Sequence, residues 1–309
     1  MKGVSKVAAL LAAAASFAMA PAYAGTRVVV TIKPVHALVA AVMRGVAEPK
    51  LLVKGSSSPH TYALAPSDAA ALNDAAVLFR VSPLLEPFTL KIVAVLPPGV
   101  RIASVMEAPG LRLLGKRRGP TFDHDAAHSS HLEGADGVDG HAWLDPDNAG
   151  LIAIYVAEVL SGSDPMHAPL YHANAESLRK ELRMLAVELE RALKPVASRA
   201  YIVFHDAMQY FERRFGLNAV GSISVSPEVP PSAKRLLELR RKLTEAGAVC
   251  AFAEPRFNTG LVSSVVENTG VRVGRLDPEA VELDPGPQLY FNLMRSLAAD
   301  LTRCLAIPA

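Results

Sequence analysis

Short apolar runs alternate with amphipathic stretches along most of this chain. Runs rich in β-branched residues predict strands at 27–32, 50–53, 76–81 and 101–104, and again at 200–204, 219–223, 248–253 and 271–276. Apolar residues at helical spacing predict helices between them, among them 35–43, 66–75, 83–95, 148–160, 231–247 and 288–304. Strands and helices that alternate over short links are typical of parallel sheets covered on both faces. The pattern therefore predicts an α/β fold.

One stretch breaks this alternation. Residues 170–194 are amphipathic throughout, and the pattern ends at Pro195. The leucines at helical spacing in this stretch are Leu178, Leu182, Leu185 and Leu189. A coiled-coil segment would show similar spacing, but about three heptads is short for one, and nothing signals a partner helix. We therefore predict two parallel-sheet lobes, at 25–165 and 195–309, joined by one long bridging helix over 166–194.

Residues 1–24 have the features of a secretory signal peptide. Lys2 and Lys6 precede an apolar run that ends at Met19, and small residues near Ala24 fit a cleavage site. The run is shorter than the ~20 residues that a bilayer span needs, and no later stretch is long and apolar enough to be one. The residue directly after the predicted cleavage site is Gly25 and not a cysteine, which argues against a lipid anchor. We expect a soluble exported protein of a bacterial periplasm.

Charge and cysteine content narrow the class of protein further. The formal net charge is +2, and removal of Lys2 and Lys6 leaves 0, so net charge gives no support to nucleic-acid binding. The two cysteines, Cys250 and Cys304, occur in a chain bound for an oxidising compartment, where pairing is the usual outcome. A cysteine metal site is the alternative, but the two residues lack CxxC spacing. We expect a disulfide.

Several polar residues lie where a parallel sheet would hold a ligand. Such ligands bind outside the carboxyl ends of the strands, often where two halves of a protein meet. His205, Glu254 and Asp277 each follow a predicted strand of the second lobe. In the first lobe, His60 follows the strand at 50–53, and His141 precedes the helix that starts near residue 148. These positions predict a site between the lobes.

Three imidazoles and one carboxylate form a four-coordinate nitrogen and oxygen site of the kind that zinc takes, with Zn–N near ~2.0 Å. For any single histidine, a hydrogen-bonded loop residue is the simpler interpretation. Three histidines at loops on both sides of a predicted cleft favour a metal site, formed by His60, His141, His205 and Asp277.

A set of motifs occurs in an order typical of one protein family. The motifs are SSSPHTYALAPSDAAALNDAAVLFRVSPLLEPF, DGHAWLDPDNA, IVFHDAMQYFERRFGL, SPEVPPSAKRLLEL, AFAEPRFN and RLDP. Over essentially the whole chain after residue 24, this set resembles the metal-binding receptors of bacterial ABC uptake transporters, specifically the zinc group (ZnuA-like). The resemblance implies two α/β lobes bridged by a long rigid helix, with the metal in the cleft between them.

The resemblance also implies the ligands. His60, His141 and His205 fall on the three histidine ligands of the family, and Asp277 falls on the aspartate that completes the site in many members. Some zinc receptors use water or a glutamate directly before the first histidine instead, but this chain has Pro59 there. Manganese and iron members place a carboxylate where His205 stands. Since imidazole suits zinc better than manganese, three histidines favour zinc, although copper and nickel also accept imidazole.

A segment rich in histidine, acidic residues and glycine precedes His141. It spans residues 119–140 and contains His124, His128 and His131. This composition is typical of a mobile acidic loop. In zinc receptors of the family, a similar insertion near the cleft is thought to gather metal at low affinity, so we expect an accessory metal loop. A solvated loop without function is the alternative.

Two further acidic residues have structural interpretations. We interpret Glu254 as half of a structural ion pair, with Arg256 as the candidate partner. Asp206 directly follows His205, so its carboxylate either orients the metal-bound imidazole or caps the next helix.

The function predicted from these observations is a periplasmic zinc receptor that captures Zn²⁺ and delivers it to an ABC permease of the inner membrane, and we expect it to be a monomer. A zinc hydrolase with three histidines and an open water position is the alternative. No HExxH motif or nucleophile elbow supports that alternative. An adhesin or a metal-storage protein on the same fold is a third reading.

Overall fold

A computed structural model describes residues 26–55, 57–117, 119–122, 137–224, 230–257 and 259–306. The predicted signal peptide and the three histidines of the predicted accessory loop, His124, His128 and His131, lie outside these ranges. None of the helices in the described ranges combines the length and the apolar composition that a membrane span requires.

The N-terminal lobe is built on a parallel four-stranded sheet with strand order β2-β1-β3-β4. Its strands are β1 (Val28–Val30), β2 (Lys50–Leu51), β3 (Val77–Arg80) and β4 (Arg101–Ser104). Alternate strand residues face opposite layers. Val28 and Phe79 share a core with α1 (Lys33–Val42) and α4 (Pro146–Ser163). Val29 and Leu78 face the other layer, which contains α2 (Pro66–Asn73) and α3 (Phe88–Val93).

The C-terminal lobe repeats this design with strand order β6-β5-β7-β8, again all parallel. Its strands are β5 (Ala200–His205), β6 (Asn218–Ser224), β7 (Cys250–Ala253) and β8 (Arg272–Arg275). One face packs on α7 (Ala233–Glu245) and α8 (Thr259–Val266), and the other faces α6 (Gln209–Phe215) and α9 (Leu289–Leu305). The predicted disulfide is confirmed, because Cys250 of β7 is bonded to Cys304 of α9.

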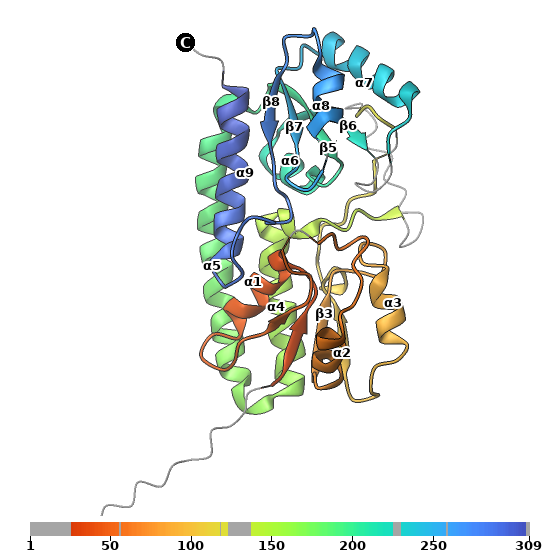
Figure 1. Ribbon diagram of the computed structural model, residues 1–309. Helices are drawn as coiled ribbons and strands as arrows, with labels where there is room; N and C mark the ends of the chain where they lie inside the picture. Colours follow the sequence, from red (N-terminus) through yellow and green to blue (C-terminus); the bar gives the residue numbers. More distant parts are fainter. Residues whose placement is uncertain are drawn as a thin grey trace, which may run out of the picture.

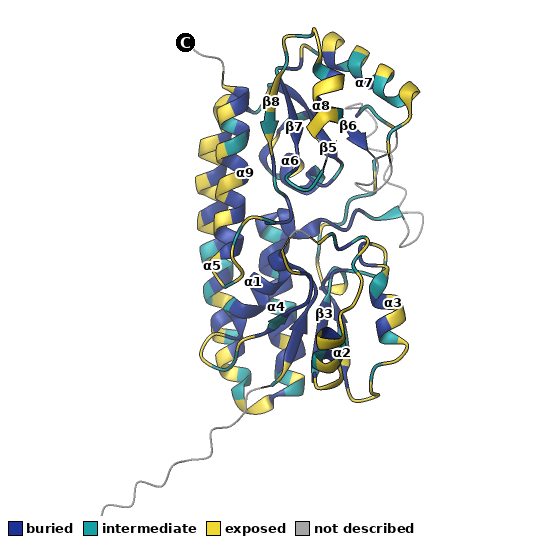
Figure 2. Ribbon diagram, in the orientation of Figure 1, coloured by how far each residue is buried: buried dark blue, intermediate teal, exposed yellow. Residues whose placement is uncertain are grey.

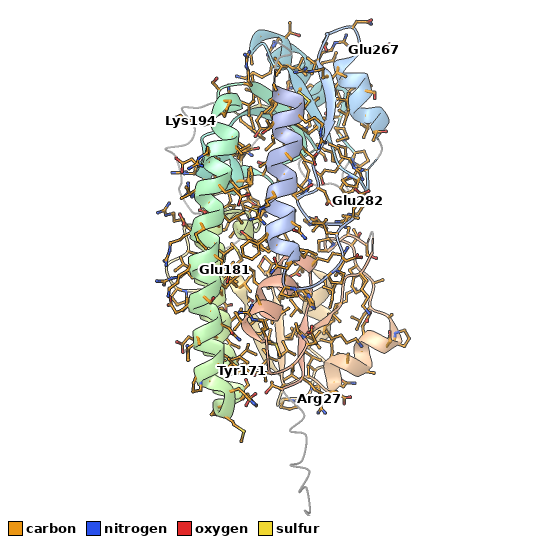
Figure 3. The ribbon with its side chains drawn as sticks, turned by 90° about the vertical axis from the view of Figure 1, so that its left-hand side faces the viewer. Arg27, Tyr171, Glu181, Lys194, Glu267 and Glu282 are labelled. Carbon is orange, nitrogen blue, oxygen red and sulfur yellow. A yellow bond between two sulfur atoms is a disulfide. The ribbon has the colours of Figure 1, made fainter. Side chains whose placement is uncertain are left out.

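A long helix, α5 (Ala168–Leu193), runs past both lobes, and α9 lies beside it (Figure 1). Tyr171 at one end of α5 lies at the N-terminal lobe and Lys194 just beyond the other end lies at the C-terminal lobe (Figure 3). The leucines predicted to form its apolar stripe are all buried, Leu178, Leu182, Leu185 and Leu189. The outer faces of α5 and α9 are exposed while their inner faces are buried (Figure 2). The predicted architecture of two parallel-sheet lobes and one bridging helix is confirmed.

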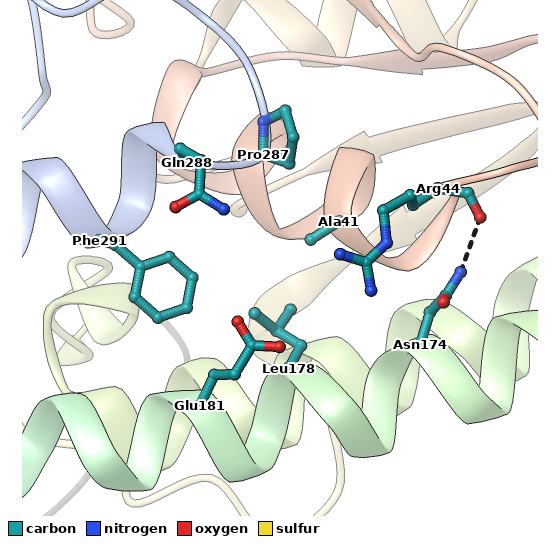
Figure 4. A pocket seen from close by; sticks show the side chains of 8 residues that line it. All are labelled: Ala41, Arg44, Asn174, Leu178, Glu181, Pro287, Gln288 and Phe291. Atoms are coloured by element: carbon teal, nitrogen blue, oxygen red, sulfur yellow. Dashed lines mark hydrogen bonds between the residues drawn. The ribbon is translucent and has the colours of Figure 1, made fainter.

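The bridging helix is fixed to α1 by a buried amide. Asn174 of α5 donates Nδ2–H bonds to the carbonyl oxygens of Val42 and Arg44, each at 2.9 Å, where α1 ends. Figure 4 shows the bond to Arg44. The hollow beside this contact is lined by Leu178, Glu181 and Phe291 among others, and no histidine lines it. The amide of Asn174 therefore satisfies the Val42 carbonyl, which the end of α1 leaves without an intrahelical partner, and the Arg44 carbonyl in the turn that follows.

The first residues of the His/acidic loop cross to the C-terminal lobe. Residues 120–122 pair antiparallel with β6, through Phe122 N–H to Val220 O and Ser222 N–H to Pro120 O, both at 3.0 Å. Gly221 permits this approach, because a Cβ at that position would lie 2.5 Å from the Pro120 carbonyl oxygen. One end of the loop is therefore fastened to the edge strand of the second sheet.

Candidate metal centre

His60, His141 and His205 come together between the two lobes. Each offers one ring nitrogen, and these three nitrogens all lie within 4.8 Å of one another. The ring centroids are 5.5 Å apart for His141 and His205, and 6.4 Å and 6.3 Å from His60 to these two rings. Three residues that are remote from one another in sequence thus form one compact nitrogen cluster, as their predicted positions in loops on both sides of a cleft indicate.

His205 is the last residue of β5 and is 2% exposed. Its Nδ1 is in direct contact with Glu254 Oε1, and the same oxygen accepts the backbone N–H of His205 at 3.3 Å. Glu254 directly follows β7, which is hydrogen-bonded to β5, so the register of parallel strands brings the two side chains together. A carboxylate on Nδ1 fixes the ring orientation and directs Nε2 to the metal.

His141 has an equivalent partner in the other lobe. It precedes the short helix η4 (Ala142–Leu144), is 6% exposed, and its Nδ1 lies 2.7 Å from Asp139 Oδ1. Asp139 Oδ1 also accepts the backbone N–H of His141 at 3.0 Å. The hydroxyl of Tyr210 donates to the carbonyl of Asp139 at 2.9 Å, and this bond holds the turn in place from the C-terminal lobe.

His60 is the third member of the cluster and has no carboxylate on Nδ1 among the contacts that the structure describes. Burial, together with the neighbouring imidazoles of His141 and His205, lowers the pKa of His60 to about 3. In the metal-free protein His60 is therefore neutral at pH 7, as a metal-binding imidazole must be.

The donor set fits a cation that prefers imidazole. Among the described residues, His60 Nε2 and His141 Nε2 are buried and have no hydrogen-bond partner. A tetrahedral zinc ion with Zn–N of about 2.0 Å would hold its nitrogens about 3.3 Å apart. The cluster, with separations of up to 4.8 Å, can contract to that geometry by small ring movements.

Asp277 is not a member of the group whose ligand atoms lie within 4.8 Å of one another. Its Oδ1 is buried without a hydrogen-bond partner in the described ranges, while Oδ2 accepts the N–H of Glu282 at 3.2 Å. Burial raises the pKa of Asp277, and hydrogen bonding from the backbone N–H groups of Val281 and Glu282 opposes that rise, with a smaller effect from Arg256. The protein groups that bind this carboxylate are thus N–H groups of its own turn.

Glu279 is an acidic neighbour of the cluster that the sequence does not single out. Its Oε1 lies 3.9 Å from His60 Nε2, and its other oxygen is in direct contact with the guanidinium of Arg256. Arg256 also donates to the carbonyl of Ser57, in the loop that carries His60. An ion pair from the C-terminal lobe therefore lies against the His60 loop of the other lobe.

Two of the structural interpretations are wrong. Glu254 does not form the predicted ion pair with Arg256, since its carboxylate is directed at His205 and Arg256 binds Glu279 instead. Asp206 neither contacts His205 nor caps α6, and it pairs with Nε of Arg117 at 3.0 Å, from the segment that crosses between the lobes. In both cases the direction of the side chain depends on a tertiary neighbour remote in sequence.

Comparison with protein families agrees with this geometry. The family described as ZnuA, zinc-uptake complex component A, periplasmic, matches residues 28–304. The match covers both sheets, the bridging helix and all members of the histidine cluster.

Individual proteins similar to this chain are also zinc uptake proteins named ZnuA. A high-affinity zinc uptake system protein ZnuA from Brucella suis is 41% identical over 305 residues, covering 90% of this chain and 91% of that protein. A protein of the same name from Paracoccus denitrificans is 34% identical, with 96% of this chain and 97% of that protein covered.

Among solved structures, the laminin-binding protein Lmb of Streptococcus agalactiae, described as bifunctional with adhesin and metal transporting activity, superposes with a TM-score of 0.74. It is 27% identical and the match covers 91% of this chain and 100% of Lmb. Family match, sequence identity and fold agree, and this chain belongs to the ZnuA family of periplasmic zinc-uptake components.

Proposed function

We propose that this protein captures Zn²⁺ in the periplasm through His60, His141, His205 and Asp277, and delivers the ion to an ABC permease. The observation that carries the proposal is the buried cluster of three imidazoles, two of them oriented by carboxylates from opposite lobes. In this role zinc is cargo, and the protein is a receptor and not an enzyme.

The chemistry of the cluster supports zinc over harder cations. Manganese and magnesium prefer carboxylate and carbonyl oxygen, whereas neutral imidazole suits zinc. The partners Glu254 and Asp139 increase the basicity of His205 and His141, which favours binding of a metal ion at Nε2. A carboxylate from Asp277 would fill the fourth position and leave none open for the water that a zinc hydrolase activates.

The lobe boundaries are part of the same proposal. We propose an N-terminal lobe to residue 165, a bridge over 166–194 and a C-terminal lobe from 195, with the His/acidic loop as an accessory site for weaker metal binding. The permease partner, the periplasmic location and removal of residues 1–24 are inferred from the family and the sequence.

A competition titration with a zinc chelator tests the proposal. One equivalent of zinc should bind tightly to the metal-free protein at neutral pH, with much weaker manganese binding, and His60→Ala, His141→Ala or His205→Ala should each weaken zinc binding by orders of magnitude. Weak zinc binding by the wild type, or a preference for manganese, would contradict it. Growth of a deletion strain under zinc chelation separates uptake from the adhesin activity that the Lmb description names.

A further inference from the structure

Lys33, the first residue of α1 in the N-terminal lobe, reaches across to the other lobe. Its ammonium donates to three backbone carbonyls there: Ala280 at 3.2 Å, Val281 at 2.7 Å and Leu283 at 2.9 Å. A lysine ammonium has three donors, so all of them are used on one turn of chain. The side chain is 9% exposed, which shields these bonds from water.

The segment that Lys33 holds is the one that carries Asp277. The chain leaves β8 and turns back on itself, with Ala280 N–H bonded to Asp277 O at 3.3 Å and Glu282 N–H bonded to Asp277 Oδ2 at 3.2 Å. Ala280 lies at the centre of the turn with φ of 57°, in the left-handed region that disfavours residues with a Cβ by about 1–2 kcal/mol. A turn of this kind needs support from outside, and the contacts to Lys33 supply it.

Charge also links Lys33 to this turn. Burial lowers the pKa of Lys33, and the carboxylates of Asp277 and Asp284 oppose that change. Because the ammonium is bonded to carbonyl oxygens and not to a carboxylate, Asp277 Oδ1 is left without a hydrogen-bond partner in the described ranges. Glu279 is bound to Arg256 through one oxygen, and its other oxygen lies 3.9 Å from His60 Nε2. The turn that Lys33 holds therefore carries two acidic side chains, Asp277 and Glu279.

We propose that Lys33 is a positioning residue for zinc. It binds the 280–283 backbone from the opposite lobe and holds in place the turn that carries Asp277, whose neighbour Glu279 lies against His60. Coordination by the Asp277 carboxylate would then depend on contact between the lobes. The inference rests on the proposed function, because it assumes that Asp277 contributes an oxygen to the metal. It adds a residue that touches neither the metal nor any of its proposed ligands.

A double-mutant cycle between Lys33→Met and Asp277→Asn tests this inference in the full-length mature protein. Lys33→Met keeps the length of the side chain and removes its charge and donors. We expect each single variant to weaken zinc binding at least tenfold, within the range typical of groups that support a metal site. If Lys33 acts through Asp277, the double variant should be no weaker than Asp277→Asn alone. Cobalt(II) bound to either variant should show the same altered visible absorption, because both would lose the same ligand.

Lys50→Met is the matched control. Lys50 Nζ also donates to a backbone carbonyl, Ser67 at 3.2 Å, but within the N-terminal lobe and exposed. It should bind zinc like the wild type. Should Lys33→Met fail to fold, as judged by circular dichroism, Lys33→Gln keeps two donors and takes its place.

Additive losses in the cycle, or an unchanged affinity and cobalt spectrum in the Lys33 variant, would overturn the inference. So would Asp277→Asn with full affinity. None of these results would contradict zinc binding by the three histidines, which the His205→Ala variant tests separately.

Discussion

Replacing Glu254 with glutamine should weaken zinc binding about tenfold, although this residue does not touch the ion. Glutamine keeps an oxygen of the same size, so it can still accept the N–H bonds from the ring and the backbone of His205. It removes the negative charge that stabilises the imidazole as a metal ligand. The carboxylate is 7% exposed, so water does not replace the lost charge.

The magnitude follows from the contacts. Partners of metal-bound histidines typically contribute about 10–100-fold to affinity, or roughly 1.4–2.7 kcal/mol. A charge-assisted hydrogen bond is about twice as strong as a neutral one, so Glu254→Gln should lie near the lower limit and Glu254→Ala near the upper one. Asp139→Asn should behave like Glu254→Gln, because Asp139 makes the same pair of contacts with His141.

Competition with a chelator of known zinc affinity, at pH 7 and fixed ionic strength, measures these differences. Glu188→Gln is the control, since it also removes a paired carboxylate, at an exposed position remote from the histidines. Affinities of Glu254→Gln and Asp139→Asn within twofold of the wild type, in folded protein, would refute the idea that these carboxylates support the ligands.

Four further outcomes are expected. Burial raises the pKa of Glu86 to about 7, so the folded protein loses stability as pH rises from 4.5 towards 7 and this side chain becomes charged. Glu86→Gln should therefore raise the free energy of unfolding in urea by up to about 3 kcal/mol at pH 8, and should not raise it at pH 4. Because the pKa of His60 is lowered to about 3, the metal-free protein should lose stability as pH falls from 6.5 towards 3. The unfolding free energy of His60→Gln should fall less steeply over this pH range, and equal slopes for variant and wild type would show that His60 is not the cause. Replacing both Cys250 and Cys304 by serine opens a link across 54 residues and should cost about 4 kcal/mol in urea unfolding. Deleting residues 123–136 should preserve the tight zinc site and remove only weaker binding, whereas loss of the tight site would show that the loop supplies a ligand.

Much of the fold could be predicted from periodicity alone. The leucine stripe predicts α5 to within about two residues at either end, because an amphipathic helix this long leaves little ambiguity. The strands Lys50–Leu51 and Val28–Val30 are shorter than the predicted 50–53 and 27–32, although the N–H groups of Leu52 and Val53 still bond to the carbonyls of Val30 and Thr31.

The meeting of His60, His141 and His205 could also be predicted, because loops at the edge of a parallel sheet lie where ligands bind. The residues that contact these histidines could not be predicted. Glu254 and Asp206 both follow strand ends, yet one contacts His205 and the other Arg117, a residue 89 positions away in sequence. Lys33 contacts carbonyls 247 to 250 positions away, and nothing in its local sequence indicates that.

The antiparallel pairing of residues 120–122 with β6 also hinders association between copies of the protein through the edge of the sheet. β6 is the outermost strand of its sheet, and an open edge of this kind presents unpaired N–H and C=O groups on which another chain can assemble. The first residues of the His/acidic loop occupy part of that edge, and Gly221 leaves room for them. The loop beyond Phe122 can therefore differ in length and composition without uncovering the edge, whereas a truncation that reaches Pro120 would leave a protein prone to edge-to-edge aggregation.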